Sequence, residues 1–218
     1  MEITYIGHSC FKVKTKNLTL VFDPYDPKKT GYALPKLSAD IVLVSHDHFD
    51  HNFVSGVSDY KLLIDKPGEY ETKGVFIYGL ESFHDNKQGK ERGKNNLFHI
   101  EADGLSLLHL GDLGHELSKE TLEQIPSVDI LFVPVGGKYT IDAEEAAEVI
   151  SQIEPGIVIP MHYSTKNTSG VLASLDPVKK FLDEMGVETI KEIEKLKISS
   201  KSEIPEETEV IVVTPAQQ

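Results

Sequence analysis

The sequence predicts an α/β fold in which two mixed β-sheets face each other and helices cover the outside. Short apolar runs, many of them β-branched, recur along the 218 residues and are typical of buried strands. Helical patterns are fewer and follow runs of strands, which divides the chain into two halves that meet near residue 100. Continuous apolar strands need cover on both faces, and two packed sheets with outer helices provide it.

Composition favours one soluble domain over residues 1–218. The net charge of −13, from 35 acidic and 22 basic residues, argues against a nucleic-acid partner, because phosphate backbones are bound largely by lysine and arginine. Four basic residues in the loop at 87–94 are better explained as a solvated loop than as a binding patch. With a single cysteine, no signal-peptide pattern and no apolar stretch of membrane length, we expect a cytoplasmic protein without a membrane span.

The first half begins with three short strands, at 3–6, 11–13 and 18–22, joined by tight polar turns. Asp23-Pro24 ends the third strand. A strand at 41–44 follows a loop rich in Pro, Lys and Gly, and a short helix is expected near 52–56. Further strands are expected at 61–64 and 75–79, separated by a turn-rich connection at 66–71. The loop at 86–95 is the most polar of the chain.

In the second half, strands at 97–100 and 105–110 are linked by the turn Asp103-Gly104, and another strand follows at 130–133. Asp142 begins a helix, because the Asp-x-x-Glu spacing to Glu145 is close to a capping box. A strand at 156–160 precedes a helix at 177–185, which Gly186 ends. Two strands, around 194–198 and 210–213, complete the predicted order.

Three histidines and two aspartates fall within residues 45–51, directly after the apolar strand at 41–44. His46 and His48 point the same way if the chain is still extended, since strand side chains alternate. Asp50 and His51 then turn away, where they can serve a second ion. Histidine and carboxylate side chains are common metal ligands, and a purely structural role explains this dense cluster poorly.

Three other potential ligands also follow apolar strands: His84, Asp112 and His162. Taken alone, His84 or His162 is more simply a structural histidine. Together with the cluster at 46–51 they predict a metal site built from strand ends.

The HxHxDH pattern at 46–51, the isolated His84, Gly111-Asp112 and the late His162 resemble the ligand motifs of the metallo-β-lactamase fold superfamily, in the same order. The strings GHSCF at 7–11, PGEYE at 67–71 and HLGDLGH at 109–115 are similar to a branch of small metal-dependent hydrolases related to L-ascorbate-6-phosphate lactonase. N-acylphosphatidylethanolamine phospholipase D is a more distant relative. The resemblance implies a four-layer αβ/βα sandwich and, with the small size, favours a homo-oligomer.

Carried over residue by residue, the resemblance implies two divalent ions, zinc first, with manganese or iron as alternatives. One ion is bound by His46, His48 and His84, the other by Asp50, His51 and His162, and Asp112 bridges them. A metal-bound hydroxide is then the nucleophile, with Asp50 orienting it or moving a proton. His8 and His115 are further catalytic or substrate-binding candidates, although His8 is equally explained as a turn residue.

Several other residues have a less specific interpretation. Asp23 either supports a metal-binding histidine or caps the turn before Pro24. Lys138 and Tyr139 lie in a glycine-containing loop on the predicted metal edge and are candidates to contact substrate. His99, His109 and Cys10 are expected to be structural; we predict that Cys10 is a small core residue and not a nucleophile.

We therefore predict a hydrolase that cleaves a small lactone, ester or phosphoester. β-Lactam hydrolysis is not expected, because the cysteine ligand of many antibiotic-hydrolysing members is absent: Cys10 is misplaced and Asp112 occupies the bridging position. Two alternatives stay open: a metal-binding or structural protein without hydrolytic activity, and a nuclease or phosphodiesterase acting on nucleic acid. The native substrate, the metal and the oligomeric state are not determined by the sequence.

Overall fold

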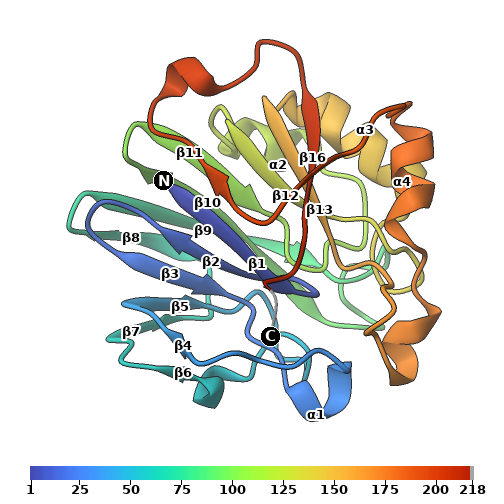
Figure 1. Ribbon diagram of the computed structural model, residues 1–218, viewed down its shortest axis with the longest axis horizontal. Helices are drawn as coiled ribbons and strands as arrows, with labels where there is room; N and C mark the ends of the chain where they lie inside the picture. Colours follow the sequence, from blue (N-terminus) through green and yellow to red (C-terminus); the bar gives the residue numbers. More distant parts are fainter. Residues whose placement is uncertain (217–218) are drawn as a thin grey trace.

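Two β-sheets packed face to face form the centre of the protein, as predicted (Figure 1). The structure is a computed structural model that describes residues 1–216. The first sheet has six strands in the order β15-β1-β2-β3-β5-β7. Their bounds are β15 (Leu196–Lys197), β1 (Glu2–Gly7), β2 (Cys10–Lys14), β3 (Thr19–Phe22), β5 (Ile41–Leu43) and β7 (Leu62–Ile64).

The second sheet has eight strands in the order β14-β16-β13-β12-β11-β10-β9-β8. These are β14 (Lys191–Ile193), β16 (Glu209–Val213), β13 (Ile157–Met161), β12 (Ile130–Pro134), β11 (Leu105–His109), β10 (Lys94–Ala102), β9 (Val75–Phe83) and β8 (Gly68–Thr72). Strands β8 to β11 pair antiparallel, whereas β11, β12, β13 and β16 pair parallel. Both sheets are mixed, which confirms the predicted fold class.

Aromatic side chains pack the space between the sheets. The rings of Phe11 on β2 and Phe132 on β12 are stacked with centroids 4.0 Å apart, and Phe22 on β3 stacks on His109 of β11 at 5.0 Å. His109 is fully buried, and its Nδ1 and Nε2 contact the backbone of Gly111 and Ser9 at 3.0 and 3.1 Å. It is therefore structural, as predicted.

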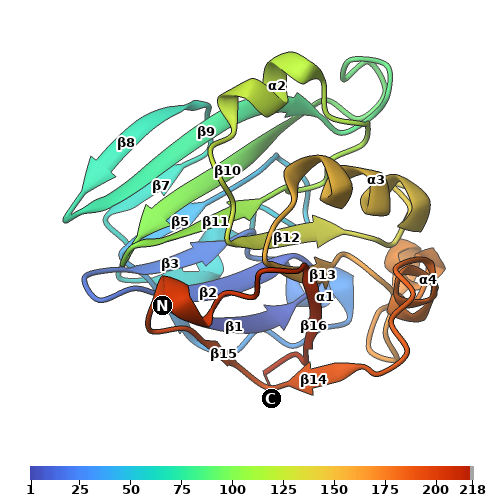
Figure 2. The same cartoon turned by 90° about the horizontal axis from the view of Figure 1, so that it is seen from above.

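Helices α2 (Lys119–Gln124), α3 (Ala143–Ile153) and α4 (Val178–Glu184) lie beside the second sheet (Figures 1 and 2). The predicted capping box is present in α3: Asp142 accepts from the N–H of Glu145, and Glu145 accepts from the N–H of Asp142. The buried residues of α3 recur at helical spacing, so one stripe of the helix faces the protein.

A thinner layer covers the outer face of the first sheet. It consists of the short helix α1 (Pro27–Thr30), the 3-10 turn η1 (Val54–Gly56) and the two-stranded ribbon of β4 (Leu37–Ser38) and β6 (Val57–Ser58). Cys10 is fully buried in the apolar cluster beneath this layer, and burial raises the pKa of its thiol well above the ordinary value. Its predicted role as a core residue is confirmed.

Several local predictions differ from the structure, because it also contains α1 and β4 in the predicted loop before Asp40 and the unpredicted strand β14. The turn-rich connection at 66–71 contains β8, an edge strand whose mostly exposed, polar residues hide the usual apolar signal. The short helix expected at 52–56 is the 3-10 turn η1. Helix α2 was not predicted at all, since none of its residues is buried. In each case an exposed element lacks the periodic apolar pattern on which the predictions rest.

The carboxyl ends of β5, β9, β11 and β13 each lead directly into a predicted ligand segment, at His46, His84, Asp112 and His162 respectively. Since β5 belongs to the first sheet and the other three to the second, both sheets contribute to the same edge. Among residues 1–216, no helix combines the length and apolar character needed to cross a membrane.

Candidate metal centre

The structure brings all seven predicted metal-binding side chains together. Donor atoms within 4.8 Å of one another form three groups that could hold a metal ion: His46, His48 and His84; His8, Asp50, His51 and His162; and His46, His51 and Asp112. The first two groups correspond to the two sites that the resemblance implies, with His8 added to the second. The third connects them through Asp112.

Asp112 lies at the centre of the cluster and is 2% exposed. Its Oδ2 faces the Nε2 atoms of four histidines: His162 at 3.1 Å, His51 and His84 at 3.2 Å, and His46 at 3.7 Å. One carboxylate oxygen therefore contacts histidines of both predicted sites.

Two neighbouring residues explain how Asp112 reaches this place. Its backbone N–H donates to Oδ1 of Asn95, 2.9 Å away, and the Nδ2 of Asn95 donates to Ser82 and Leu110. Gly111 has φ +55°, and a Cβ there would lie 2.6 Å from the Cβ of Ser45 and still closer to Asn95. Only glycine fits this turn, which accounts for the Gly-Asp pair.

Asp23 orients two of the histidines. Its Oδ2 lies 2.9 Å from Nδ1 of His51 and accepts the hydroxyl of Ser45 at 2.6 Å; Ser45 Oγ in turn lies 2.9 Å from Nδ1 of His46. When Nδ1–H donates outward in each ring, Nε2 of His46 and of His51 faces the cluster and can offer its lone pair to an ion. The interpretation of Asp23 as a support for a histidine is confirmed by these contacts.

His8 lies behind Asp50 and not in the open site. It is fully buried, and its Nε2 is 3.1 Å from Oδ2 of Asp50. Its ring also lies 4.4 Å from the ring of His162 between centroids. His8 thus contacts one predicted ligand and packs on another, so its contacts are those of a positioning residue.

The buried surroundings shift the pKa values of the cluster histidines in opposite directions. Burial lowers the pKa of His46 well below its ordinary value and that of His8 to about 4. Burial alone would also lower the pKa of His51, but the carboxylates of Asp112 and Asp50 outweigh it and raise that pKa well above normal. Burial alone would raise the pKa of Asp112, but the neighbouring His162 and His51 lower it by more. The net pKa is well below the ordinary value, so the carboxylate is ionised.

Several side-chain nitrogen and oxygen atoms of the cluster that could bind a metal have no hydrogen-bond partner among residues 1–216. They include Nε2 of His46, which lies 3.7 Å from Asp112 Oδ2, and Oδ1 of Asp112, both deeply buried. Buried polar atoms are normally paired, and unpaired ones in a ring of imidazoles and carboxylates are suited to divalent cations. The residues present therefore fit the metal ions that the resemblance implies.

A cavity of about 150 Å³ opens onto this cluster. It is lined by His48, Phe49, Asp50, His84, Arg92, Asp112, Tyr139, His162, Val171 and Leu172. Tyr139, a candidate for substrate contact, lines the cavity, whereas Lys138 is exposed and does not. Arg92, which lies in the loop predicted to be solvated, also lines it.

The loop that carries Arg92 is organised by Asp85. The Asp85 carboxylate accepts four backbone N–H groups, those of residues 87, 89, 91 and 92, at 2.7–3.0 Å. Burial raises the pKa of Asp85, but these donors outweigh it and lower the pKa to about 2. A segment whose composition suggests a solvated loop is thus hydrogen-bonded around one carboxylate.

We expect Asp85→Ala to loosen this loop. Amide hydrogen exchange at residues 87–92 should accelerate by about tenfold or more, because hydrogen bonds to a charged acceptor are among the stronger ones. Glu91→Gln is the matched control, since Glu91 is exposed and its carboxylate pairs only with Lys87. Equal exchange rates in Asp85→Ala and the control would contradict this role of Asp85.

The lowered histidine pKa values also predict acid sensitivity of the metal-free protein. Unfolded histidines bind protons near pH 6.5, whereas buried His8, His46 and His109 resist protonation. The unfolded state then binds more protons, so the free energy of unfolding falls as pH falls from about 6.5 to about 4. His51, whose pKa is raised, is protonated in both states below about pH 6.5 and therefore does not change this slope. Urea denaturation of chelator-treated protein across this range measures the effect, and a pH-independent midpoint would contradict it.

His115 and His99 are not brought to the cluster. His115 accepts from the N–H of Phe83 at Nε2, 3.2 Å, and its Nδ1 contacts the carbonyl of Glu116 at 2.6 Å. Both ring nitrogens are engaged with backbone, and His115 does not line the cavity. These contacts give no support to the prediction that His115 is catalytic. His99 is buried beside Tyr78, as expected of a structural residue.

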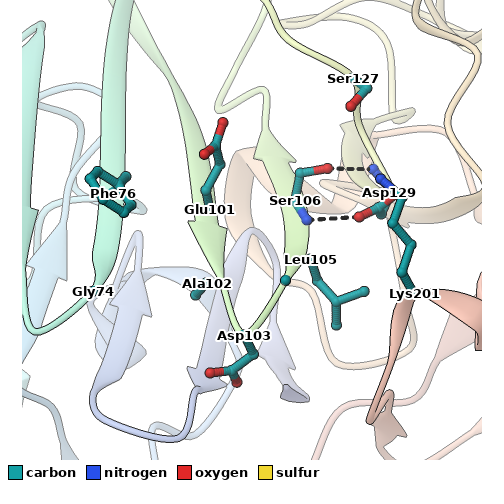
Figure 3. Close-up of a pocket in the computed structure, with 11 residues that line it drawn as sticks. Gly74, Phe76, Glu101, Ala102, Asp103, Leu105, Ser106, Ser127, Asp129 and Lys201 are labelled. Atoms are coloured by element: carbon teal, nitrogen blue, oxygen red, sulfur yellow. Dashed lines mark hydrogen bonds and ion pairs between the residues drawn. The ribbon is translucent and has the colours of Figure 1, made fainter.

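A larger cavity, of about 340 Å³, lies where β9, β11 and β12 begin, at the opposite end of these strands from the cluster (Figure 3). Its central polar groups satisfy one another. The Ser106 N–H donates to Asp129, the Asp129 N–H donates to Ser106 Oγ, and Lys201 lies 3.2 Å from Asp129. None of the metal-capable groups found among residues 1–216 lies here. The metal-capable side chains therefore lie at the smaller of these two cavities.

Comparison with known proteins shows the family of this chain. Residues 2–162 match the model of the beta-lactamase superfamily domain. A UPF0173 metal-dependent hydrolase of Carboxydothermus hydrogenoformans is 30% identical over 198 residues, covering 76% of this chain and 85% of that protein. A crystal structure from Thermotoga maritima, described as a Zn-dependent hydrolase of the metallo-beta-lactamase superfamily, is 38% identical, with TM-score 0.78 and 97% of each chain covered. The chain therefore belongs to the beta-lactamase superfamily, has the metallo-β-lactamase fold, and is similar to members named metal-dependent hydrolases.

Proposed function

We propose that this protein is a metal-dependent hydrolase that acts on small molecules with two divalent ions. In this proposal one ion is held by His46, His48 and His84, the second by Asp50, His51 and His162, and Asp112 bridges them. The observation that carries the proposal is the position of Asp112 Oδ2, within 3.1–3.7 Å of histidines from both groups. A single structural ion does not require a carboxylate shared between two ligand groups.

Zinc is the first candidate, with manganese or iron as alternatives, because imidazole and carboxylate ligands suit all three. The description of the Thermotoga maritima relative as Zn-dependent supports this order. Ions bound here would polarise the scissile group and lower the proton affinity of the attacking water.

The chain's own residues then handle the proton and the orientation. Asp50 lines the cavity, and its carboxylate is held by Nε2 of His8. Burial raises the pKa of Asp50, but His51 and His8 outweigh it and keep the carboxylate ionised, so it accepts hydrogen bonds. In this role the Asp50 carboxylate receives the proton of the attacking water, and His8, held against its Oδ2, fixes its direction.

The substrate class is a small lactone, ester or phosphoester. The cavity of about 150 Å³ and a neighbouring one of about 420 Å³, which both include His48 and Arg92 in their walls, fit a small substrate better than a folded polymer. The resemblance to lactonases adds lactones to the range, and the names of the relatives support hydrolysis in general.

The test combines metal content with turnover. Protein purified without chelator and supplied with Zn²⁺, Mn²⁺ or Fe²⁺ should hold two ions per chain by elemental analysis. It should also hydrolyse at least one of 4-nitrophenyl acetate, bis(4-nitrophenyl) phosphate and γ-butyrolactone, in a chelator-sensitive manner.

Each alternative has its own outcome. Saturation at one ion would overturn the dinuclear reading. Two ions without turnover of any of these substrates would favour a binding protein. Tight, salt-dependent binding to RNA would favour a nuclease.

A further inference from the structure

We propose that Arg92 is a substrate-binding residue and that the native substrate carries a carboxylate or phosphate group in addition to the bond that is cleaved. This inference rests on the proposed function and specifies its substrate class. Arg92 would pair with that oxyanion inside the cavity that opens onto the metal cluster.

Arg92 is the only arginine among the 22 basic residues of the chain. Lysine supplies every other basic side chain, including the exposed surface pairs. Arginine differs from lysine in presenting a planar fork of N–H donors that matches a carboxylate or phosphate in two parallel hydrogen bonds. The one position with an arginine is also a position that lines the cavity.

The guanidinium group of Arg92 is held in place but not neutralised. The Cζ atom of Arg92 lies 5.4 Å from the centroid of the Tyr139 ring, and Nη2 lies 3.5 Å from the carbonyl oxygen of Lys138. The backbone N–H of Arg92 donates to Asp85 at 2.7 Å. No carboxylate of residues 1–216 forms an ion pair with it, whereas the nearby Lys87 and Lys94 pair with Glu91 and Glu81.

Among the residues that line this cavity, Arg92 is the one suited to pair with an anionic group of the substrate. Phe49 and Val171, which are 38% and 56% exposed, supply apolar surface to this cavity. The lining carboxylates, Asp50 and Asp112, are already surrounded by histidines. An anionic substrate would therefore place its charge at Arg92 and its apolar part against Phe49 and Val171.

Two esters of similar length, one anionic and one neutral, test whether Arg92 selects anionic substrates. The metal-loaded protein is assayed with mono(4-nitrophenyl) glutarate, which carries a distal carboxylate, and with neutral 4-nitrophenyl pentanoate of similar length. Arg92→Gln should lower the ratio of kcat/KM for the anionic over the neutral ester by about tenfold or more, mainly through KM. Arg92→Lys should give an intermediate ratio, because it keeps the charge and loses the fork.

Lys90→Gln is the matched control. Lys90 is exposed in the same loop and does not line the cavity, so this change removes one positive charge and should leave the ratio unchanged. Arg92 could instead have a purely structural role, joining its own loop to the loop of Lys138 and Tyr139. In that case Arg92→Gln would lower kcat/KM for both esters equally, and this result would overturn the inference. So would an equal change of the ratio in Lys90→Gln.

A binding measurement separates this inference from the proposed hydrolysis. Isothermal titration of the metal-loaded protein with phenylacetate and with benzylphosphonate should show weaker binding to Arg92→Gln than to wild type. The ligand with the larger loss identifies carboxylate or phosphate as the preferred oxyanion. If no ester is turned over but this loss is found, the proposed reaction fails and the anion site stands. If affinity is independent of Arg92 for both ligands, the anion site fails, whatever the hydrolysis assays show.

Discussion

Replacing Asp112 with asparagine is expected to remove both metal ions and reduce hydrolysis by about a thousandfold or more, the largest effect of any single change. Asparagine keeps the size of the side chain but loses the charge that faces four histidine Nε2 atoms. That charge offsets the repulsion between two dications, so its loss should weaken both proposed sites together. Elemental analysis and ester or phosphodiester turnover, measured on the same preparation, give the result.

Asp47→Asn is the matched control for this variant. Asp47 lies between His46 and His48 in sequence, but its side chain is exposed and accepts from Asn52 at 2.6 Å. The control should retain two ions and most of its activity. Far-ultraviolet circular dichroism shows whether Asp112→Asn is folded. A folded Asp112→Asn protein that retains two ions would refute the bridging role.

The second large effect is the separate loss of one ion in His84→Ala and in His162→Ala. His84 groups with His46 and His48, whereas His162 groups with Asp50 and His51. Each change takes one of three terminal ligands from its own proposed site and leaves the other intact. We expect each variant to bind about one ion and to lose about a hundredfold or more in kcat, because both ions contribute to the reaction.

Crystallographic occupancy of the two sites distinguishes these variants from each other. His84→Ala should empty the site near His46 and His48, and His162→Ala the site near Asp50 and His51. His115→Ala is the control, because its ring nitrogens contact only backbone. If His162→Ala emptied the site near His46 and His48, the assignment would be reversed. If neither variant lost metal, the centre would consist of the cluster at 46–51 alone.

Most of the fold could be predicted from the sequence because its strands are buried. Apolar runs such as 41–44 and 130–133 have one stable environment, between two covered faces, and the structure confirms both as strand segments. Exposed elements such as β8 and α2 were missed, because solvent imposes no apolar period on their residues.

The candidate metal ligands could be named from the sequence for a related reason. A polar residue directly after a buried strand is held at the edge of the sheet, whatever loop follows, and His46, His84, Asp112 and His162 all have this position. Local sequence is sufficient to place each of them at a strand end.

Only the tertiary structure decided which side chains face one another. His115 is close in sequence to Asp112, yet its ring turns to the backbone of Phe83, whereas Asn95, 17 positions away, holds the Asp112 backbone. From the sequence, Arg92 is predicted to lie in a solvated loop. In the structure, Asp85 holds that loop by hydrogen bonds and Arg92 lies beside Tyr139. The physical reason is that burial and strand ends follow from neighbours along the chain. Contacts between loops depend on how distant strands are ordered in the two sheets, and no local pattern encodes that order.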